Sequence, residues 1–388
     1  MKRLEKIKQE GLYRTLRNNE QEGAYIYLSA DKPMLNLSSN DYLGLASDKK
    51  LQEEFYQEIA ARSNALRLSA SSSRLLTGNF SIYDKVEGLL QSLYNRKGAL
   101  IFNSGYHANT GILPAIAESA DLILADKLVH ASIIDGLKLA SADSFRYRHN
   151  DMGHLRKLIQ DKKDKYNRIF IVTESLFSMD GDEADLKALV ALKEEYPQIM
   201  IYLDEAHAVG VRGNTGLGIC EEEGLIQEID FIVGTFGKAL AGVGAYVICS
   251  SEHKELLINT MRTLIFTTGL PPVNLHWSYF ILKRLASFSK ERAQLSAIID
   301  LLKSDPAFRN CESRSHIMPY FIGNSEEAMI RSMELQEQGF FALAVRPPTV
   351  PKDTARLRLS LRSDIPVSEL KRFLEILSPK KHEANFDK

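Results

Sequence analysis

The chain has 388 residues, of which 44% are hydrophobic, so it carries enough apolar material for more than one folded core. Its 49 basic and 50 acidic residues nearly balance, which excludes a general attraction to nucleic acid or to an anionic membrane. Three cysteines, Cys220, Cys249 and Cys311, form no C-x-x-C pair, and this fits a reducing cytoplasm. No apolar signal core or stretch of bilayer length is present, so we expect neither export nor membrane insertion.

The first 45 residues predict an N-terminal arm. An amphipathic segment at about residues 3–17 predicts a helix, and a strand-like run follows at residues 24–28. We expect this arm to pack over the body of the protein or over a partner subunit.

Short β-rich runs alternate with helical segments through the middle of the chain. This alternation is typical of crossover units on a mostly parallel sheet with helices on both faces, so we predict an α/β fold for a large domain at residues 46–275. Seven runs predict seven strands, at residues 98–102, 122–125, 144–148, 168–173, 199–203, 231–234 and 244–249. Ligands of such sheets bind at the carboxyl ends of the strands. Five runs are followed there by polar residues, namely Asn103, Asp126, His149, Glu174 and Asp204.

The character of the sequence changes after residue 270. A helical stretch is followed by strand-like runs at residues 318–322, 341–345 and 356–361. We predict a smaller C-terminal α+β domain at residues 276–388, and we expect the polar tail at residues 379–388 to fray.

Two strand ends carry the residue types that pyridoxal phosphate requires. Lys238 follows the run at residues 230–234 in a loop of small residues, and Asp204 and His207 follow the run at residues 199–203. The cofactor is an aldehyde on a pyridine ring, so a protein must supply an amine for an imine and an acid partner for the ring nitrogen. Lys238 and Asp204 fit these two roles, and we predict a pyridoxal phosphate site.

Other phosphate-binding motifs do not fit the same segment. A lone Gly-Lys pair is more often the end of a loop than a catalytic amine. A P-loop is excluded because Ile232 replaces its first glycine and Ala239 follows the lysine in place of Ser or Thr. A dinucleotide fingerprint is excluded because the glycines do not have the required order or a leading strand; they are Gly213, Gly216 and Gly218.

A metal site is not expected. His149 and His154 are five residues apart, which does not place them on one face of a helix. We therefore assign no metal ligand.

Several segments together resemble one family, the α-oxoamine synthases of the aspartate-aminotransferase-like fold. The resemblance runs in order over nearly the whole chain. Its motifs are LSSNDYLGL (37–45), NSGY (103–106), HAS (130–132), HND (149–151), TESLFSMDG (173–181), DEAH (204–207) and TFGK (235–238).

This resemblance implies a role for each matching residue around the cofactor. Lys238 would form the imine and later act as a base, Asp204 would pair with the pyridine nitrogen, and His130 would stack over the ring. His207 and Ser178 would bond near the phenolic oxygen of the ring. The phosphate would be held by Gly105, Tyr106 and Thr235, with a further contact from Thr267 or Thr268 of a neighbouring subunit, because members of the family act as homodimers with the active site at the interface.

The resemblance also implies residues for the substrates. Arg358 would bind the amino-acid carboxylate, a bidentate task that suits guanidinium. Asn40 and His130 would also contact substrate, and Arg17 and Thr349 match positions that contact the acyl group. Taken alone, a residue placed like His130 more often caps the start of a helix, and one placed like Arg17 is more often a solvated surface residue.

The segments RPPTVP (346–351) and ARLRL (355–359) look most like the members that condense L-alanine with pimeloyl-CoA or a pimeloyl carrier protein, with loss of carbon dioxide, to give 8-amino-7-oxononanoate for biotin. Glycine C-acetyltransferase, which the segment at residues 130–136 also resembles, and serine palmitoyltransferase are the alternatives. A non-catalytic pyridoxal-binding regulator is a remote alternative, because no DNA-binding segment precedes the body.

One segment departs from the family pattern. SASSSRLLTG (69–78) stands where the family usually has several glycines. Side chains there make backbone conformations with positive φ less favourable and restrict the approach of an acyl chain. This departure bears on which acyl substrate the protein accepts.

Overall fold

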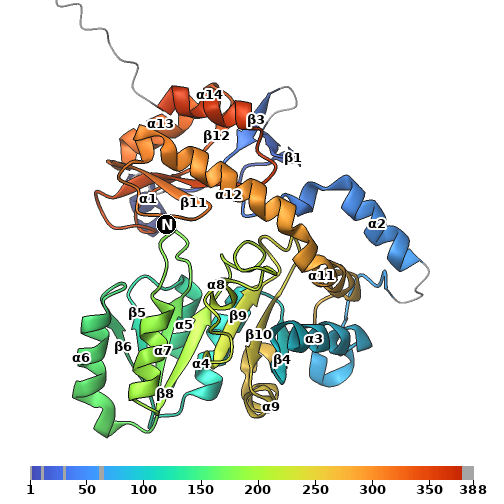
Figure 1. The fold of residues 1–388 in the computed structure, drawn as a ribbon, viewed down its shortest axis with the longest axis vertical. Coiled ribbons are helices and arrows are strands. Elements are labelled where there is room, and N and C mark those ends of the chain that lie inside the picture. The colour runs from blue at the N-terminus through green and yellow to red at the C-terminus, as the bar shows by residue number, and fades with distance from the viewer. Residues whose placement is uncertain (1, 10–12, 29–31, 61–64, 378–388) are drawn as a thin grey trace, which may run out of the picture. The chain divides into compact units, whose positions relative to one another are not determined.

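The computed structural model describes the chain except residues 1, 10–12, 29–31, 61–64 and 378–388 (Figure 1). By its contacts the chain divides into two compact units. The small unit comprises residues 1–47, 179–181 and 293–388, and the large unit comprises residues 48–178 and 182–292. The domain boundaries expected after residues 45 and 275 stay a prediction. The tail expected to fray, at residues 379–388, lies outside the described residues.

The large unit is built on a seven-stranded sheet in the order β4-β10-β9-β8-β7-β5-β6. β10 is antiparallel to both of its neighbours and the other pairs are parallel, which confirms the predicted mostly parallel sheet. Side chains on both faces of the central strands are buried, as continuous apolar runs predict. The strands are β4 (Gly98–Phe102), β5 (Leu122–Asp126), β6 (Asp143–Tyr147), β7 (Ile169–Glu174), β8 (Ile199–Asp204), β9 (Phe231–Thr235) and β10 (Ala245–Cys249).

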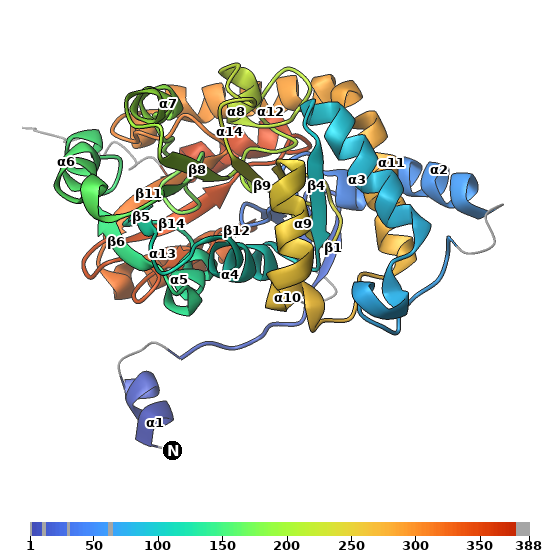
Figure 2. The ribbon, with the colours of Figure 1, turned by 90° about the horizontal axis from the view of Figure 1, so that it is seen from below.

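Helices cover both faces of this sheet. The apolar core on one face joins alternate strand residues to α4, α5, α9 and α10, and Figure 2 shows α7 and α8 on the opposite side of the strands. The α-helices of the large unit are α2 (Lys49–Ala60), α3 (Ser81–Tyr94), α4 (Gly105–Ile116), α5 (Ala131–Leu139), α6 (Met152–Lys162), α7 (Leu186–Glu195), α8 (Ile219–Glu222), α9 (Ser251–Thr260), α10 (Arg262–Ile265) and α11 (Pro272–Arg284). Shorter helical turns are η2 (Arg74–Gly78), η3 (Lys163–Lys165) and η4 (Leu285–Phe288).

The small unit contains two sheets, in the orders β1-β2-β3-β12 and β11-β14-β13. β12 pairs in parallel with β3, so the first and last parts of the chain share one sheet. The strands are β1 (Glu20–Glu22), β2 (Tyr25–Tyr27), β3 (Pro33–Asn36), β11 (Ile317–Gly323), β12 (Phe340–Phe341), β13 (Ala344–Val345) and β14 (Ala355–Ser360). The helices are α1 (Lys2–Gln9), η1 (Leu45–Ser47), α12 (Ser289–Ser304), η5 (Pro306–Phe308), α13 (Ser325–Glu337) and α14 (Val367–Leu377).

Two expected elements of the small unit were wrong in extent. The helix expected at residues 3–17 ends at Gln9, and residues 13–19 are irregular, with Arg14 and Arg17 bonded to Thr349 and Gln336. The single strand expected at residues 341–345 is divided between β12 and β13, which lie in different sheets. Strand partners far away in the sequence, β3 for β12 and β14 for β13, determine this division.

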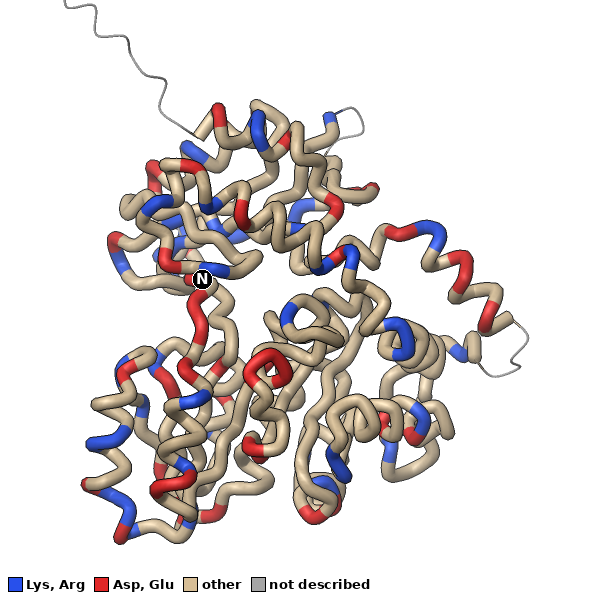
Figure 3. Tube along the Cα trace, in the orientation of Figure 1, with Lys and Arg blue, Asp and Glu red and all other residues tan. Residues whose placement is uncertain are grey.

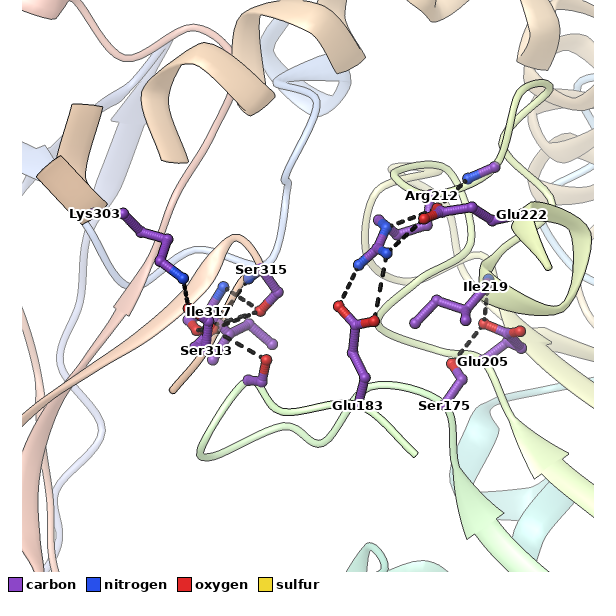
Figure 4. A network of polar contacts seen from close by, with 12 residues as sticks. Ser175, Glu183, Glu205, Arg212, Ile219, Glu222, Lys303, Ser313, Ser315 and Ile317 are labelled. Carbon is purple, nitrogen blue, oxygen red and sulfur yellow. Dashed lines mark hydrogen bonds and ion pairs between the residues drawn. The ribbon is translucent and has the colours of Figure 1, made fainter. Parts of the chain in front are cut away.

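Polar clusters close the loops of each unit (Figure 4). In the large unit the buried carboxylate of Glu205 accepts bonds from Ser175 Oγ (2.6 Å) and from the backbone N–H of Ile219 (3.1 Å) and Cys220 (2.7 Å). In the small unit Ser313 Oγ donates to the carbonyl of Ile317 (2.6 Å). The donors and acceptors of these buried groups are thus paired within the protein, as is usual for buried polar atoms.

Charges of both signs are interspersed along the helices of both units, as the balanced composition suggests (Figure 3). No helix in the described part of the chain is long and apolar enough to cross a membrane.

The serine-rich segment adopts a backbone conformation that favours glycine. Ser71 has φ 56°, and its N–H donates to Ser69 Oγ (3.0 Å). A side chain at this φ is unfavourable by about 1–2 kcal/mol, so the local bond to Ser69 offsets part of the strain. The segment therefore keeps a glycine-like backbone while its side chains occupy the space that glycines would leave open.

Close contact between α4 and α5 depends on Gly136. A Cβ built on Gly136 would overlap the carbonyl oxygen of Asn109 in α4. We predict that Gly136→Ala lowers the free energy of unfolding by about 1–3 kcal/mol, because the two helices must separate. Gly88 in α3 is the matched control, since a Cβ there meets no atom within 4 Å. Gly88→Ala is expected to stabilise the protein by up to about 1 kcal/mol. Urea denaturation of both variants measures the difference; equal effects would contradict the prediction.

Candidate active site

A cavity of about 180 Å³ lies at the edge of the seven-stranded sheet where the parallel strands end. Its walls come from the starts of α4 and α5, the ends of β7, β8 and β9, and the loops that follow β8 and β9. The lining residues are Gly105, Tyr106, Asn109, His130, Ser132, Glu174, Asp204, Ala206, His207, Thr235 and Lys238. The fold therefore brings seven of the eight residues expected to hold a cofactor to one cavity; Ser178 is not among the lining residues.

Lys238 is half-buried in the loop after β9, and its Nζ lies 2.7 Å from Nε2 of His207. The loop is held by Thr235, which donates to the carbonyl of Gly244 (3.0 Å) and accepts from the N–H of Gly237 (3.1 Å). Gly244 has φ 109°, a conformation that glycine adopts without strain. The loop thus presents an amine beside an imidazole that can exchange a proton with it.

Asp204 ends β8 and is 6% exposed. Its Oδ1 accepts from the backbone N–H of Ala206 (2.9 Å), and its Oδ2 accepts from Nδ2 of Asn109 (2.8 Å). Hydrogen bonds from N–H donors stabilise the ionised form of a carboxylate. Two donors from different elements therefore fix both oxygens of Asp204 at the cavity wall.

Asn109 connects Asp204 to His130. Its Oδ1 accepts from the hydroxyl of Tyr202 (2.6 Å), while its Nδ2 donates to Asp204 and to Ser132 Oγ (3.0 Å). Because Ser132 Oγ accepts from Asn109, its own proton can go to His130 Nδ1, 2.7 Å away. The buried Tyr202 has a pKa well above its usual value because of burial, so it remains a neutral donor. A continuous chain of bonds therefore runs from β8 through α4 to α5.

His130 caps the N-terminus of α5, since its Nδ1 also accepts from the backbone N–H of Ser132 (3.2 Å). With Nδ1 an acceptor, the neutral ring carries its proton on Nε2. The pKa of His130 is lowered by burial and by Lys238, with Asp204 opposing them. Although part of the ring is exposed, its protein surroundings disfavour the charged form. His130 therefore both caps α5, as considered from the sequence, and lines the cavity.

The start of α4 supplies a site for an anion. Gly105 and Tyr106 open the helix, and Ser104 Oγ caps it by accepting from the N–H of His107 (3.2 Å). The first N–H groups of a helix have no partner within it, and together with the helix dipole they attract negative charge. Nearby, Asn103 Nδ2 donates to the carbonyl of Thr268 (2.6 Å), so the loop containing Thr267 and Thr268 is tied to this turn within the chain.

Of the five residues expected to contact substrate, four belong to the small unit, and two of these four lie together. Arg358 Nη1 donates to Asn40 Oδ1 (3.5 Å) and to Ser360 Oγ (2.6 Å), and Asn40 Oδ1 also accepts from the hydroxyl of Tyr42 (3.0 Å). Burial raises the pKa of Tyr42 to about 12 although Arg358 lowers it, so this hydroxyl stays protonated. Asn40 and Tyr42 therefore support the guanidinium of Arg358.

The other two expected residues have different partners. Arg17 Nη1 donates to Gln336 Oε1 (3.3 Å), whereas Thr349 Oγ1 accepts from Arg14 Nη2 (3.0 Å). The contact to Thr349 thus comes from Arg14, which the sequence did not single out. Nothing in the local sequence distinguishes Arg14 from Arg17 as the residue that reaches Thr349.

His149 lies outside the lining of this cavity. Its Nδ1 and Nε2 bond to Asp126 (2.9 Å) and Asp182 (2.7 Å), and His154 bonds instead to the backbone N–H of Arg148 (2.9 Å). His149 and His154 therefore have different hydrogen-bond partners. Burial alone would lower the pKa of His149, but the two carboxylates raise it to about 10.

Comparison with known proteins gives the family. The family model described as aminotransferase class I and II matches residues 32–377. The chain belongs to this family. A relative from Haemophilus influenzae (strain 86-028NP), provisionally named 8-amino-7-oxononanoate synthase, is 51% identical over 376 residues, covering 96% of this chain and 98% of the relative. A relative of the same provisional name from Neisseria meningitidis serogroup A is 52% identical with the same coverage.

Solved structures agree with the sequence comparison. Serine palmitoyltransferase from Sphingomonas wittichii superposes with a TM-score of 0.85 at 26% identity, covering 97% of this chain and 94% of that one. 8-amino-7-oxononanoate synthase from Francisella tularensis superposes with a TM-score of 0.71 at 29% identity, covering 89% and 96%. Serine palmitoyltransferase from S. paucimobilis, with pyridoxal phosphate and myriocin bound, has a TM-score of 0.86. The predicted aspartate-aminotransferase-like fold is confirmed.

The chain is thus a pyridoxal-phosphate-dependent enzyme of the acyltransferase type, as the sequence predicted. The cavity has the chemistry that this cofactor needs: an amine on Lys238, a buried carboxylate on Asp204, and a helix start at Gly105 that suits a phosphate. The carboxyl of Glu174 also leaves an oxygen without a hydrogen-bond partner in the described part of the chain. The residues present therefore fit the cofactor.

The sequence did not place four of the lining residues in the site. Ser132 and Glu174 belong to the motifs HAS and TESLFSMDG, but no role in binding was assigned to them. Ala206 belongs to the motif DEAH, between Asp204 and His207. Asn109 was missed entirely, although it is four residues after Gly105 and thus on the same face of α4. That spacing is the signal that could have revealed it.

We predict that Asn109→Ala lowers the free energy of unfolding by about 2–4 kcal/mol, because it removes a bond to a charged group and leaves the Tyr202 hydroxyl buried without its partner. It should also weaken retention of pyridoxal phosphate on gel filtration, since Asp204 loses a donor. Tyr202→Phe is the matched control, because it removes the hydroxyl but keeps the bond from Asn109 to Asp204. Loss of cofactor in Tyr202→Phe equal to that in Asn109→Ala would contradict this assignment.

A second prediction concerns His149. Its folded-state pKa of about 10 exceeds the unfolded value of about 6.5, so its contribution to stability is complete below pH 6.5 and is lost as the pH rises through about 10. Urea denaturation across this range should show a steeper fall in stability for the wild type than for His149→Gln. His154→Gln should keep the slope of the wild type; identical slopes in the wild type and His149→Gln would refute the prediction.

Proposed function

We propose that this enzyme condenses L-alanine with a pimeloyl thioester, carried by coenzyme A or a carrier protein, and releases carbon dioxide, the thiol and 8-amino-7-oxononanoate. The cavity that joins Lys238, Asp204 and the start of α4 supports the chemistry. The choice of substrates rests on one observation, the 51–52% identity over nearly the full length to relatives provisionally named 8-amino-7-oxononanoate synthase. We also propose that the enzyme acts in the cytoplasm. There it would catalyse the step of biotin synthesis that uses these two substrates.

When bound, pyridoxal phosphate supplies an aldehyde that joins to amines and a pyridine ring that accepts the electron pair released at the substrate α-carbon. Asp204, held by Asn109 and the N–H of Ala206, would place its negative charge at the ring nitrogen. Charge that develops only in the transition state is stabilised most effectively by such a fixed partner.

Lys238 would remove the α-proton of alanine once its amine is released. His207, 2.7 Å from Lys238 Nζ, would keep the amine in position and share its proton. General acid–base catalysis of this kind contributes about 10²–10⁴-fold to rates. We assign His207 and Ser178 to the phenolic oxygen of the ring, and Gly105, Tyr106 and Thr235 to the phosphate.

His130 and Arg358 would orient the substrate. A neutral His130 with its proton on Nε2 can cover one face of the ring and donate to a developing oxyanion. Arg358 would bind the alanine carboxylate next to Asn40, and Arg17 and Thr349 would contact the acyl group. Orientation of this kind raises rates by holding the reacting atoms together. We further propose a homodimer with the active site at its interface.

Serine palmitoyltransferase is the second candidate, because its structures give TM-scores up to 0.86 against 0.71 for the 8-amino-7-oxononanoate synthase. Those structures are 26–28% identical to this chain, whereas the named relatives are about twice as similar in sequence. The backbone of this family is shared by enzymes with different acyl donors, so sequence identity carries more weight for the substrate.

A panel of substrates tests the proposal. Alanine, glycine and serine are each combined with pimeloyl, acetyl and palmitoyl thioesters of coenzyme A, and release of the thiol and of carbon dioxide is measured. We expect alanine with the pimeloyl thioester to exceed every other pair in kcat/KM by about tenfold or more, since one wrong methylene or hydroxyl is discriminated by about 10–200-fold. Preference for serine with the palmitoyl thioester, or glycine with the acetyl thioester, would reject it.

Two variants accompany the panel. Lys238→Ala should lower kcat by about 10²–10⁴-fold or more, because it removes both the amine and the base. Lys157→Ala, on the exposed face of α6, controls for loss of a positive charge and should keep the activity of the wild type.

A further inference from the structure

Glu174 is a buried acid in the cavity that the proposed mechanism leaves without a task. It ends β7 directly beside Asp204, its register partner on β8, and it is 3% exposed. It lines the cavity, and its Oε1 has no hydrogen-bond partner in the described part of the chain. Buried polar atoms are nearly always paired in folded proteins, so an unpaired oxygen in a ligand cavity indicates a partner that arrives with the ligand.

The groups around Glu174 decide its charge. Burial raises its pKa well above the usual value, and the neighbouring carboxylates of Asp204 and Asp126 raise it further. Lys238 and the backbone N–H of His130 oppose them without reversing the direction. Two carboxyl groups that share a site do not both ionise readily, and Asp204 has two N–H donors while Glu174 keeps an unpaired oxygen. The surroundings of Glu174 therefore favour its protonated form.

We propose that Glu174 is a cofactor-binding residue that acts in its neutral form, as a hydrogen-bonding wall of the pyridoxal phosphate site. As a neutral acid it can both donate and accept, and it adds no second negative charge beside Asp204. A charged Glu174 would instead add negative charge to the cavity wall beside Asp204. This inference rests on the cofactor and not on the choice of alanine or pimeloyl thioester.

Two substitutions separate its charge from its hydrogen bond. Glu174→Gln keeps the size and the ability to donate and accept, and it is always neutral. Glu174→Leu keeps the approximate size and removes the hydrogen bond. Glu205→Gln is the matched control, because Glu205 is a fully buried acid directly after β8 whose bonds come from Ser175, Ile219 and Cys220 within the protein (Figure 4).

The measurements use the holoenzyme without substrate, so they are independent of the substrate panel. The pH titration of the visible absorbance of bound pyridoxal phosphate reports the charge near the cofactor, and cofactor release on dilution reports its affinity. Thermal unfolding of each variant reports folding.

We expect Glu174→Gln to keep the midpoint of the absorbance titration and to bind the cofactor within about threefold of the wild type, because one neutral donor replaces another. Glu174→Leu should weaken cofactor binding by about tenfold, the usual loss of one hydrogen bond, without a lower melting temperature for the cofactor-free protein. Glu205→Gln should lower the melting temperature and leave the titration and affinity unchanged.

Two results would overturn the proposal. A shift of the titration midpoint by about one pH unit or more in Glu174→Gln would mean that Glu174 is charged beside the cofactor. Cofactor affinity and a titration equal to those of the wild type in Glu174→Leu would mean that Glu174 makes no contact with it.

Discussion

The hydrogen bond from Asn109 to Asp204 is the contact on which the arrangement of the site depends. It ties α4, whose first turn suits an anion, to the end of β8, where a buried carboxylate would otherwise lack a side-chain donor. The same amide nitrogen reaches Ser132, and through it His130, so one residue sets the spacing between three walls of the cavity. Close packing of α4 on α5 at Gly136 makes this reach possible.

Electrostatics in the cavity follow from that network. Asp204 receives two N–H donors, whereas burial and the neighbouring carboxylate of Asp204 raise the pKa of Glu174 more than Lys238 and the backbone N–H of His130 lower it. Glu174, whose pKa is raised, thus lies beside Asp204, next to His130, whose pKa is lowered, and the amine of Lys238. Such separation of pKa values between adjacent groups is typical of sites that must hold one charge in a fixed place.

The residues proposed for the cofactor chemistry and those proposed for substrate choice belong to different parts of the chain. The amine, the carboxylate and the helix start all belong to the large unit and are those that pyridoxal phosphate requires of any enzyme in the family. The residues proposed to select the substrate, such as Arg358 and Asn40, belong to the small unit, and the serine-rich segment keeps a glycine-like backbone at Ser71. Enzymes with one fold can therefore differ in acyl donor while sharing their cofactor chemistry.

The sequence by itself determined the seven strands and the mostly parallel sheet, because buried apolar runs are local signals, while the resemblance of its motifs to a family indicated the cofactor and the residues expected around it. Only the tertiary structure decided the extent of the N-terminal helix, the division of residues 341–345 between two sheets, and the contact from Arg14 to Thr349, since each depends on partners far away in the chain. The same reason explains Asn109 and Glu174: their roles arise from groups on other elements that meet them only after folding.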